Sequence, residues 1–366
     1  MENREQRLFN MDLLRVICSV FVIIEHFCET NGCNAFGYSL ESMSVLSYPM
    51  LRIIYSIARV AVPCFIILSG YFSIYSTKQK FRKVVSLTLT VIAYSMITYF
   101  VGIIFGSNPV SLKNILFIFL PQNYYLYLFL TLYLLSPYIN RLIAELNQKQ
   151  YQRLLLILVF AFVIWSTVIN TLCGLFDMQL TGVYATGRTT TDMGFNICNF
   201  ITLYLLGGYM RKYPISLSKN GKLLSFAVIS VCVLITAMSE IIFADYAVDL
   251  LSYDSMFVVL QSVLIVMIFS NVKVSSKPII TFAANNTFGI YLIHWYFLTF
   301  FANRIFYAEK FIKSGFGGCI MISLATIICA YICSLTFSAL FNFAVKPLSK
   351  RFNKTKIAGA RIFIDG

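Results

Sequence analysis

Ten long apolar segments constrain the fold of this chain more than any other feature of its sequence. A helix that crosses a bilayer needs about 20 mostly apolar residues, and this chain of 366 residues is 59% hydrophobic and only 12% charged. So few charges cannot cover the surface of a soluble protein. We therefore predict an all-α integral membrane protein, a polytopic bundle of about ten transmembrane helices. The predicted spans are residues 9–28, 50–75, 84–106, 124–140, 153–173, 194–210, 223–243, 255–272, 282–303 and 316–345.

The net charge of +14 is compatible with nucleic-acid binding or with basic loops between membrane spans, and the position of the basic residues separates the two. If the N-terminus is cytoplasmic, 21 of the 29 lysines and arginines fall in inner loops or the tail, and five fall in outer loops. This bias predicts that both termini are cytoplasmic and that nucleic acid is not a partner. We expect a single domain over 1–366, with a core of about 8–345 and a basic cytoplasmic tail, 346–366.

The cysteines and histidines give little sign of a metal site. Most of the ten cysteines lie within predicted spans, where they act as small apolar residues. Cys28 and Cys33 flank the first outer loop, and a disulfide between them stays an open alternative. No Cys/His cluster has the spacing of metal ligands, so no metal is predicted.

The first span carries four ionisable side chains, which are costly in a membrane and mark functional sites by default. Arg15 and His26 are eleven residues apart, so they share one helix face to within about 20° and differ in depth by about 16.5 Å. Asp12 is within reach of an ion pair with Arg15. The alternative is that Arg15 snorkels to the inner surface and His26 is merely interfacial.

The second span and a late span add further polar candidates. Arg59 lies at a depth similar to that of His26, and Glu25 or a bound anionic group is expected to compensate its charge. Pro63 should bend the helix, and Ser69 with Gly70 should allow a neighbouring helix to approach closely. His294 is either satisfied by a neighbouring helix or functional.

These segments together resemble the integral-membrane acyltransferase-3 family, which modifies glycans and other cell-envelope molecules. The family motif of a basic residue, ten residues and a histidine in the first span corresponds here to Arg15 and His26. The lead-in NMDLLR, the pattern R-VAVPCFIILSGYF of the second span and the late GIYLIH around His294 are similar too. The resemblance covers essentially the whole chain.

The resemblance implies a membrane O-acyltransferase that moves an acyl group, by default acetyl, from cytoplasmic acyl-CoA to a hydroxyl of an envelope glycan or lipid-linked sugar. It implies acetyl-CoA as a co-substrate without a tightly bound cofactor, membrane lipids as partners, and a bacterial-type inner membrane as the location. Four groups would be catalytic: His26 as general base, with Arg15, Arg59 and Glu25. Substrate would be bound by His294, Tyr291, Ser69 and Tyr71.

The family also carries an R-x-x-R element that is associated with acyl-CoA binding, and this sequence departs from it. The nearest counterpart is the cluster Lys80-Phe-Arg-Lys83, which lacks the arginine pair. We expect Lys80, Arg82 and Lys83 to attract the phosphates of acyl-CoA together with Arg15 and Asp12, although a solvated inner loop explains the three basic residues almost as well.

Two other functions fit a membrane protein of this kind. One is a transporter or flippase of a polysaccharide or glycan precursor, although the spans hold no row of carboxylates suited to a proton relay. The other is a sensor or assembly partner without catalysis. Within the enzyme class, His294 is the alternative general base, because other membrane acyltransferases use a histidine deep in a late helix.

Overall fold

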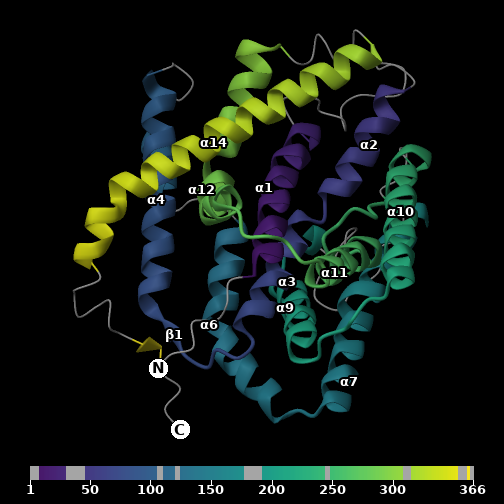
Figure 1. Cartoon of the computed structure of the whole chain (residues 1–366). Coiled ribbons are helices and arrows are strands. Elements are labelled where there is room, and N and C mark those ends of the chain that lie inside the picture. Colours follow the sequence, from purple (N-terminus) through teal and green to yellow (C-terminus); the bar gives the residue numbers. More distant parts are fainter. Residues whose placement is uncertain are drawn as a thin grey trace.

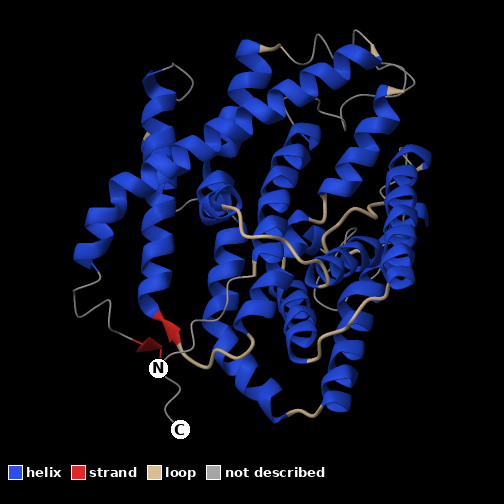
Figure 2. Cartoon of the chain, viewed as in Figure 1, coloured by secondary structure: helices blue, strands red, loops and turns tan. Residues whose placement is uncertain are grey.

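The computed structural model describes residues 8–29, 46–104, 110–119, 124–176, 192–243, 248–307, 315–352 and 361–362. Helices dominate these residues, and one short strand pair joins two distant segments (Figure 2). The elements are α1 (Phe9–Glu29), α2 (Ser47–Ala58), α3 (Ala61–Ser73), β1 (Gln79–Lys80), α4 (Phe81–Ile104), α5 (Leu112–Phe119), α6 (Tyr124–Glu145), α7 (Gln148–Val159), the π-helix η1 (Phe160–Ile164), α8 (Trp165–Phe176), the 3-10 turn η2 (Asp192–Gly194), α9 (Ile197–Lys212), α10 (Lys219–Ile242), α11 (Met256–Ser270), α12 (Pro278–Phe300), the π-helix η3 (Phe301–Ile305), α14 (Phe316–Phe352) and β2 (Arg361–Ile362).

Within the described residues, each of the ten predicted apolar segments overlaps helix, whereas helix α5 lies in none of them. In the described residues, six helical stretches are long and apolar enough to cross a membrane: Ser47–Ser73, Phe81–Ile104, Leu112–Glu145, Gln148–Phe176, Lys219–Ile242 and Phe316–Lys346. Helix α1 carries several charges, and α9 and α11 are shorter than a full span. An all-helical membrane bundle is therefore supported, whereas ten crossings and the orientation of the termini stay predictions.

Two element boundaries differ from the sequence expectation. The segment 50–75 is not one continuous helix, because α2 ends at Ala58 and α3 begins at Ala61. Pro63 has no N–H to donate to the carbonyl of Arg59, which frees the chain to turn there. Residues 141–145 continue α6 instead of forming a turn, and Asn147 begins α7 with a capping box to Gln150.

Helix α1 lies in the interior of the bundle, between α4 on one side and α10 on the other (Figure 1). It packs against α2, α3, α11, α12 and α14. The long α14 crosses obliquely over the bundle in Figure 1 and packs against α12 and α1. The charged side chains of α1 are therefore surrounded by protein, which is where a membrane protein can hold them.

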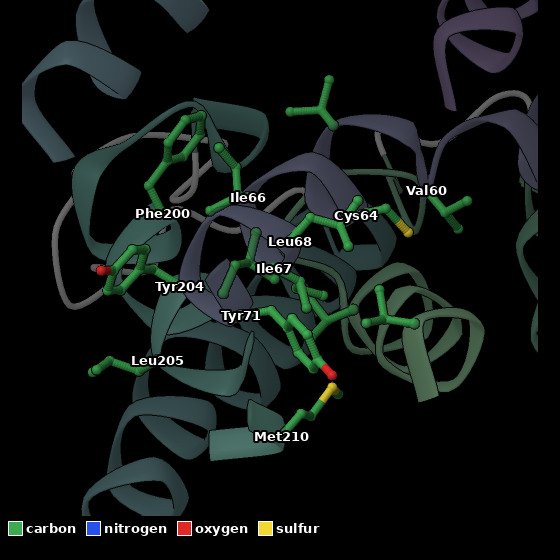
Figure 3. Packing of buried hydrophobic residues seen from close by; sticks show 14 of the residues in the cluster. Val60, Cys64, Ile66, Ile67, Leu68, Tyr71, Phe200, Tyr204, Leu205 and Met210 are labelled. Atoms are coloured by element: carbon green, nitrogen blue, oxygen red, sulfur yellow. The ribbon is translucent and has the colours of Figure 1, made fainter. Parts of the chain in front are cut away.

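Close packing of α3 on α9 forms the centre of the larger core. Figure 3 shows Ile66, Ile67 and Leu68 of α3 facing Phe200 and Tyr204 of α9. The predicted close approach at Gly70 is confirmed, since a Cβ atom there would lie 1.8 Å from the carbonyl oxygen of Tyr204. Gly207 of α9 is in the same position toward α3, where a Cβ would lie 1.9 Å from the carbonyl oxygen of Ile67.

We expect Gly70→Ala to destabilise the protein by about 3 kcal/mol, the upper end of the usual cost of overpacking, because backbone atoms of α9 cannot move aside as a side chain would. Thermal unfolding in detergent measures the change. Gly317→Ala is the matched control, because a Cβ at Gly317 of α14 meets no atom within 4 Å. Equal unfolding temperatures for the two variants would contradict this account of the α3–α9 contact.

Candidate functional site

Arg15 lies near the start of α1, where it is held by two neighbours. Its Nη1 atom is 3.4 Å from Oδ1 of Asp12, so the predicted ion pair is confirmed. The guanidinium also lies over the ring of Phe72, 4.7 Å from the ring centre. The side chain of Arg15 is 34% exposed and that of Asp12 only 4%. Asp12 thus orients a cation that still reaches open space.

Arg59, in the turn between α2 and α3, is at the centre of a buried charge cluster. Its Nη1 donates to Oε1 of Glu25, which confirms the expected pairing, and lies 3.2 Å from Oε1 of Glu29. Its Nε donates to the carbonyl of Leu251 at 2.6 Å, and the guanidinium lies 3.9 Å from the ring centre of Tyr253. Only 2% of the Arg59 side chain is exposed.

His26 is oriented by Glu29, one turn further along α1. The Nδ1 atom of His26 lies 3.1 Å from Oε2 of Glu29. The other carboxylate oxygen, Oε1, accepts a hydrogen bond from the hydroxyl of Tyr55 at 2.7 Å. Because a carboxylate can only accept, Nδ1 carries the proton, and Nε2 is the basic nitrogen of His26.

The sequence analysis missed Glu29, because it lies just beyond the predicted span 9–28. The signal that could have found it is the i, i+3 spacing from His26, which brings two side chains together on a helix. Glu25, at i−1, points elsewhere and pairs with Arg59, as expected. Glu29 contacts both His26 and Arg59, so it joins His26 to the buried charge cluster.

The two histidines of the chain lie against each other. The imidazole rings of His26 and His294 are stacked, with centres 5.1 Å apart and planes at 24°. Nδ1 of His294 donates to the carbonyl of Tyr291 at 2.7 Å, and Nε2 of His294 is buried without a hydrogen-bond partner in the described part of the chain. Trp295 meets the ring of His26 edge-on, at 5.3 Å.

One cavity, which we name the Arg15 cavity, begins beside Arg15 and runs between α1, α3, α4, α6 and α12. Its volume is about 200 Å³. Arg15 and Lys83 are the charged residues of its wall, and apolar side chains line most of the remainder. Lining residues include Arg15, Val22, Phe65, Ser69, Lys83 and Tyr291. Val22 lies one helical turn before His26, so along α1 this cavity reaches to within one turn of His26.

A larger cavity, which we name the Trp295 cavity, lies between α4, α5, α12 and η3. Its volume is about 630 Å³, and its lining residues include Ser95, Thr98, Tyr99, Asn114, Trp295 and Arg304. On α4, Lys83 and Leu87 line the Arg15 cavity, whereas residues within 95–102 line the Trp295 cavity. On α12, His294 lies between Tyr291, which lines the Arg15 cavity, and Trp295, which lines the Trp295 cavity.

Comparison with models of protein families matches the acyltransferase domain of the acyltransferase-3 family over residues 8–343. The chain belongs to the acyltransferase-3 family of membrane O-acyltransferases. Comparison with curated proteins gives no match, and comparison with solved structures gives none. The matched range is close to the predicted core, 8–345.

In this acyltransferase, four of the twelve predicted site residues line the Arg15 cavity, and none of them lines the Trp295 cavity. Arg15, Ser69, Lys83 and Tyr291 all line the Arg15 cavity, and Ser69 donates to the carbonyl of Phe65. His294 contacts His26 directly. These residues are carried by α1, α3, α4 and α12.

Two of the predicted residues, Tyr71 and Arg82, do not line the Arg15 cavity. The guanidinium of Arg211 lies over the ring of Tyr71, 5.2 Å from the ring centre. Tyr71 also lines a separate small pocket near the end of α9. Arg82 lies at the start of α4 and is partly exposed. The side chain of Lys80 and the residue Cys33 fall outside the described residues, whereas Cys28 is a buried free thiol.

A second buried ion pair in the acyltransferase went unassigned by the sequence analysis. Nη1 of Arg52 lies 3.2 Å from Oε2 of Glu240, and Nη2 donates to the hydroxyl of Tyr48.

In the loop before α11, burial raises the pKa of Asp249, although the positive charge of Arg59 acts to lower it. No group of three His, Cys, Asp or Glu side chains that could hold a metal ion occurs among the residues with assigned positions.

Proposed function

We propose that this acyltransferase moves an acetyl group from cytoplasmic acetyl-CoA to a hydroxyl of an envelope glycan, with His26 as general base. One observation carries the proposal: Nδ1 of His26 is held by Glu29, and His26 lies one helical turn from Val22 of the Arg15 cavity and against Trp295 of the Trp295 cavity. A base with a fixed tautomer close to two substrate sites is the arrangement that direct acyl transfer needs.

The Arg15 cavity suits the donor. Its basic residues, Arg15 and Lys83, attract the phosphates of CoA, and its apolar walls suit the pantetheine arm. The distance from Arg15 to His26 along α1 is about 16.5 Å at 1.5 Å per residue, comparable to the length of that arm. The excess of basic residues in the expected inner loops supports a cytoplasmic mouth, and with it a bacterial-type inner membrane location.

The chemistry follows from the positions of the groups. Nε2 of His26 takes the proton of the acceptor hydroxyl while the oxygen attacks the thioester carbonyl. The new C–O bond forms, the C–S bond breaks, and the CoA thiolate leaves with the proton from His26. Tyrosine hydroxyls are the favoured donors to the developing oxyanion, because Arg59 is engaged by Glu25, Glu29 and Leu251.

Radiolabelled acetyl-CoA tests the proposal. Purified protein in detergent is incubated with labelled acetyl-CoA and membranes of the host strain, and released CoA thiol and labelled glycan are measured together. We expect one CoA released per acetyl group transferred. A protein that moves glycan across vesicles without releasing CoA would be a transporter, and the proposal would be wrong.

Arg15→Ala should raise the apparent KM for acetyl-CoA about tenfold and change kcat little, because a partly exposed phosphate contact is worth about 1 kcal/mol or slightly more. Steady-state CoA release measures both constants. Arg211→Ala is the matched control: Arg211 also lies over an aromatic ring, that of Tyr71, but outside the Arg15 cavity. If both variants have the wild-type KM for acetyl-CoA, Arg15 does not bind the acyl donor.

A further inference from the structure

The Trp295 cavity combines polar groups and aromatic rings in a way that a lipid-facing surface does not need. Ser95, Thr98 and Asn114 contribute hydroxyl and amide groups, while Tyr99 and Trp295 contribute rings. The outer surfaces of the same helices are apolar, as the exposed Leu89, Phe100 and Leu116 of α4 and α5 show. Polar lining in such surroundings indicates a polar ligand.

A buried hydroxyl supports the same conclusion. Tyr99 is 8% exposed, and its hydroxyl has no hydrogen-bond partner within the described residues. Buried tyrosine hydroxyls are normally bonded, and leaving one unbonded costs about 1–3 kcal/mol. Since Tyr99 lines the cavity, a ligand there that carries hydroxyl groups would satisfy it.

We infer that the Trp295 cavity binds the acyl acceptor, and that the acceptor is a neutral or acidic sugar whose ring lies against Trp295. This inference rests on the proposed function and adds the place and class of the acceptor. A sugar ring has an apolar face that packs on an aromatic ring and hydroxyls around its edge. The cavity matches both properties and, at about 630 Å³, has room for one or two rings.

The position of Trp295 puts the sugar beside the base. The ring of Trp295 meets the imidazole of His26 edge-on, at 5.3 Å, and Trp295 also lines the cavity. A sugar that packs against Trp295 therefore lies within one side chain of His26. Tyr291, one helical turn before Trp295 on α12, lines the Arg15 cavity, so the donor and acceptor cavities use neighbouring turns of the same helix.

Charge narrows the class of sugar. Arg304 of η3 is the charged residue of the cavity lining. Its guanidinium repels a cationic amino sugar and attracts a carboxylate or a phosphate linkage. The site therefore selects neutral or acidic sugars, which are acylated on oxygen.

Two substitutions test the inference through kinetics. Tyr99→Phe removes one hydroxyl and should raise the apparent KM for the membrane glycan acceptor about fivefold, the usual effect of one hydrogen bond. Trp295→Leu should raise it about tenfold. In both variants the KM for acetyl-CoA should stay within twofold of the wild-type value. Tyr127→Phe, on the exposed face of α6, and Trp165→Phe, on α8, are the matched controls.

Direct binding tests the inference without turnover. The chain has two tryptophans, so Trp295 is the only indole in the Trp165→Phe protein, and its emission is titrated with oligosaccharides released from the host envelope. We expect a saturable change. A flat titration, or unchanged acceptor KM in both variants with normal CoA release, would overturn the cavity assignment and leave the proposed function standing. Saturable binding without any acetyl transfer would overturn the proposed function alone.

Discussion

His26→Gln should lower acetyl transfer about a thousandfold, because general acid–base catalysis by one positioned group contributes about 10²–10⁴-fold. Glutamine has a similar size but no basic nitrogen, so the stacking against His294 and the bundle itself should persist. The initial rate of CoA release with host membranes as acceptor measures the loss. An unfolding temperature near that of the wild type separates lost chemistry from lost structure.

The neighbouring residues supply the comparison. Glu29→Gln should cost about tenfold, because the carboxamide retains one hydrogen-bonding oxygen but loses the charge that stabilises protonated His26. His294→Gln tests the alternative base. If His294→Gln abolished acetyl transfer and His26→Gln retained it, His294 would be the general base. The contact between Glu29 and His26 would then not serve catalysis by His26.

Arg59→Leu should destabilise the protein by about 3–5 kcal/mol, the usual cost of removing one partner from a buried ion pair. The guanidinium contacts Glu25, Glu29 and the carbonyl of Leu251. Without it, two carboxylates face each other inside the bundle. Thermal or denaturant unfolding in detergent measures the difference.

Arg15→Leu is the control for the Arg59 prediction. Arg15 makes an ion pair on the same helix bundle, but its side chain is 34% exposed, so its removal should cost less than about 1 kcal/mol. In Arg59→Leu, adding Glu25→Gln should restore part of the lost stability, because one of the two uncompensated charges is then removed. Equal stability of the Arg59 and Arg15 variants would show that the buried cluster does not hold the fold.

Hydropathy located most of the helices but not α5, because a segment that must satisfy its own backbone hydrogen bonds in lipid has few alternatives to helix. Local spacing also predicted the Asp12–Arg15 pair, which depends on one helical turn. Burial cost predicted that Glu25 or a bound anionic group compensates Arg59, and Arg59 contacts Glu25 and also Glu29. These inferences depend on the cost of placing polar groups in lipid and on the spacing of residues along one helix, and both can be read from the sequence.

Contacts between distant segments were beyond the sequence analysis. His26 and His294 are separated by most of the chain, and nothing in either segment specifies that they stack. The Trp295 cavity takes its wall from α4, α5, α12 and η3, so it exists only once these helices pack. Tyr71 shows the opposite error: it is close to Ser69 in sequence, but it faces Arg211 instead of the Arg15 cavity.

The glycine contact between α3 and α9 also determines which wall of the Arg15 cavity is fixed in position. One face of α3 rests on the backbone of α9, through Gly70 and Gly207, while another face lines the cavity with Phe65 and Ser69. The α3 wall cannot shift away from the cavity, because the backbone of α9 lies directly behind it. The other walls are formed by α1, α4, α6 and α12. We expect any widening of the cavity around a thioester chain to come from these helices, while α3 keeps its place against α9.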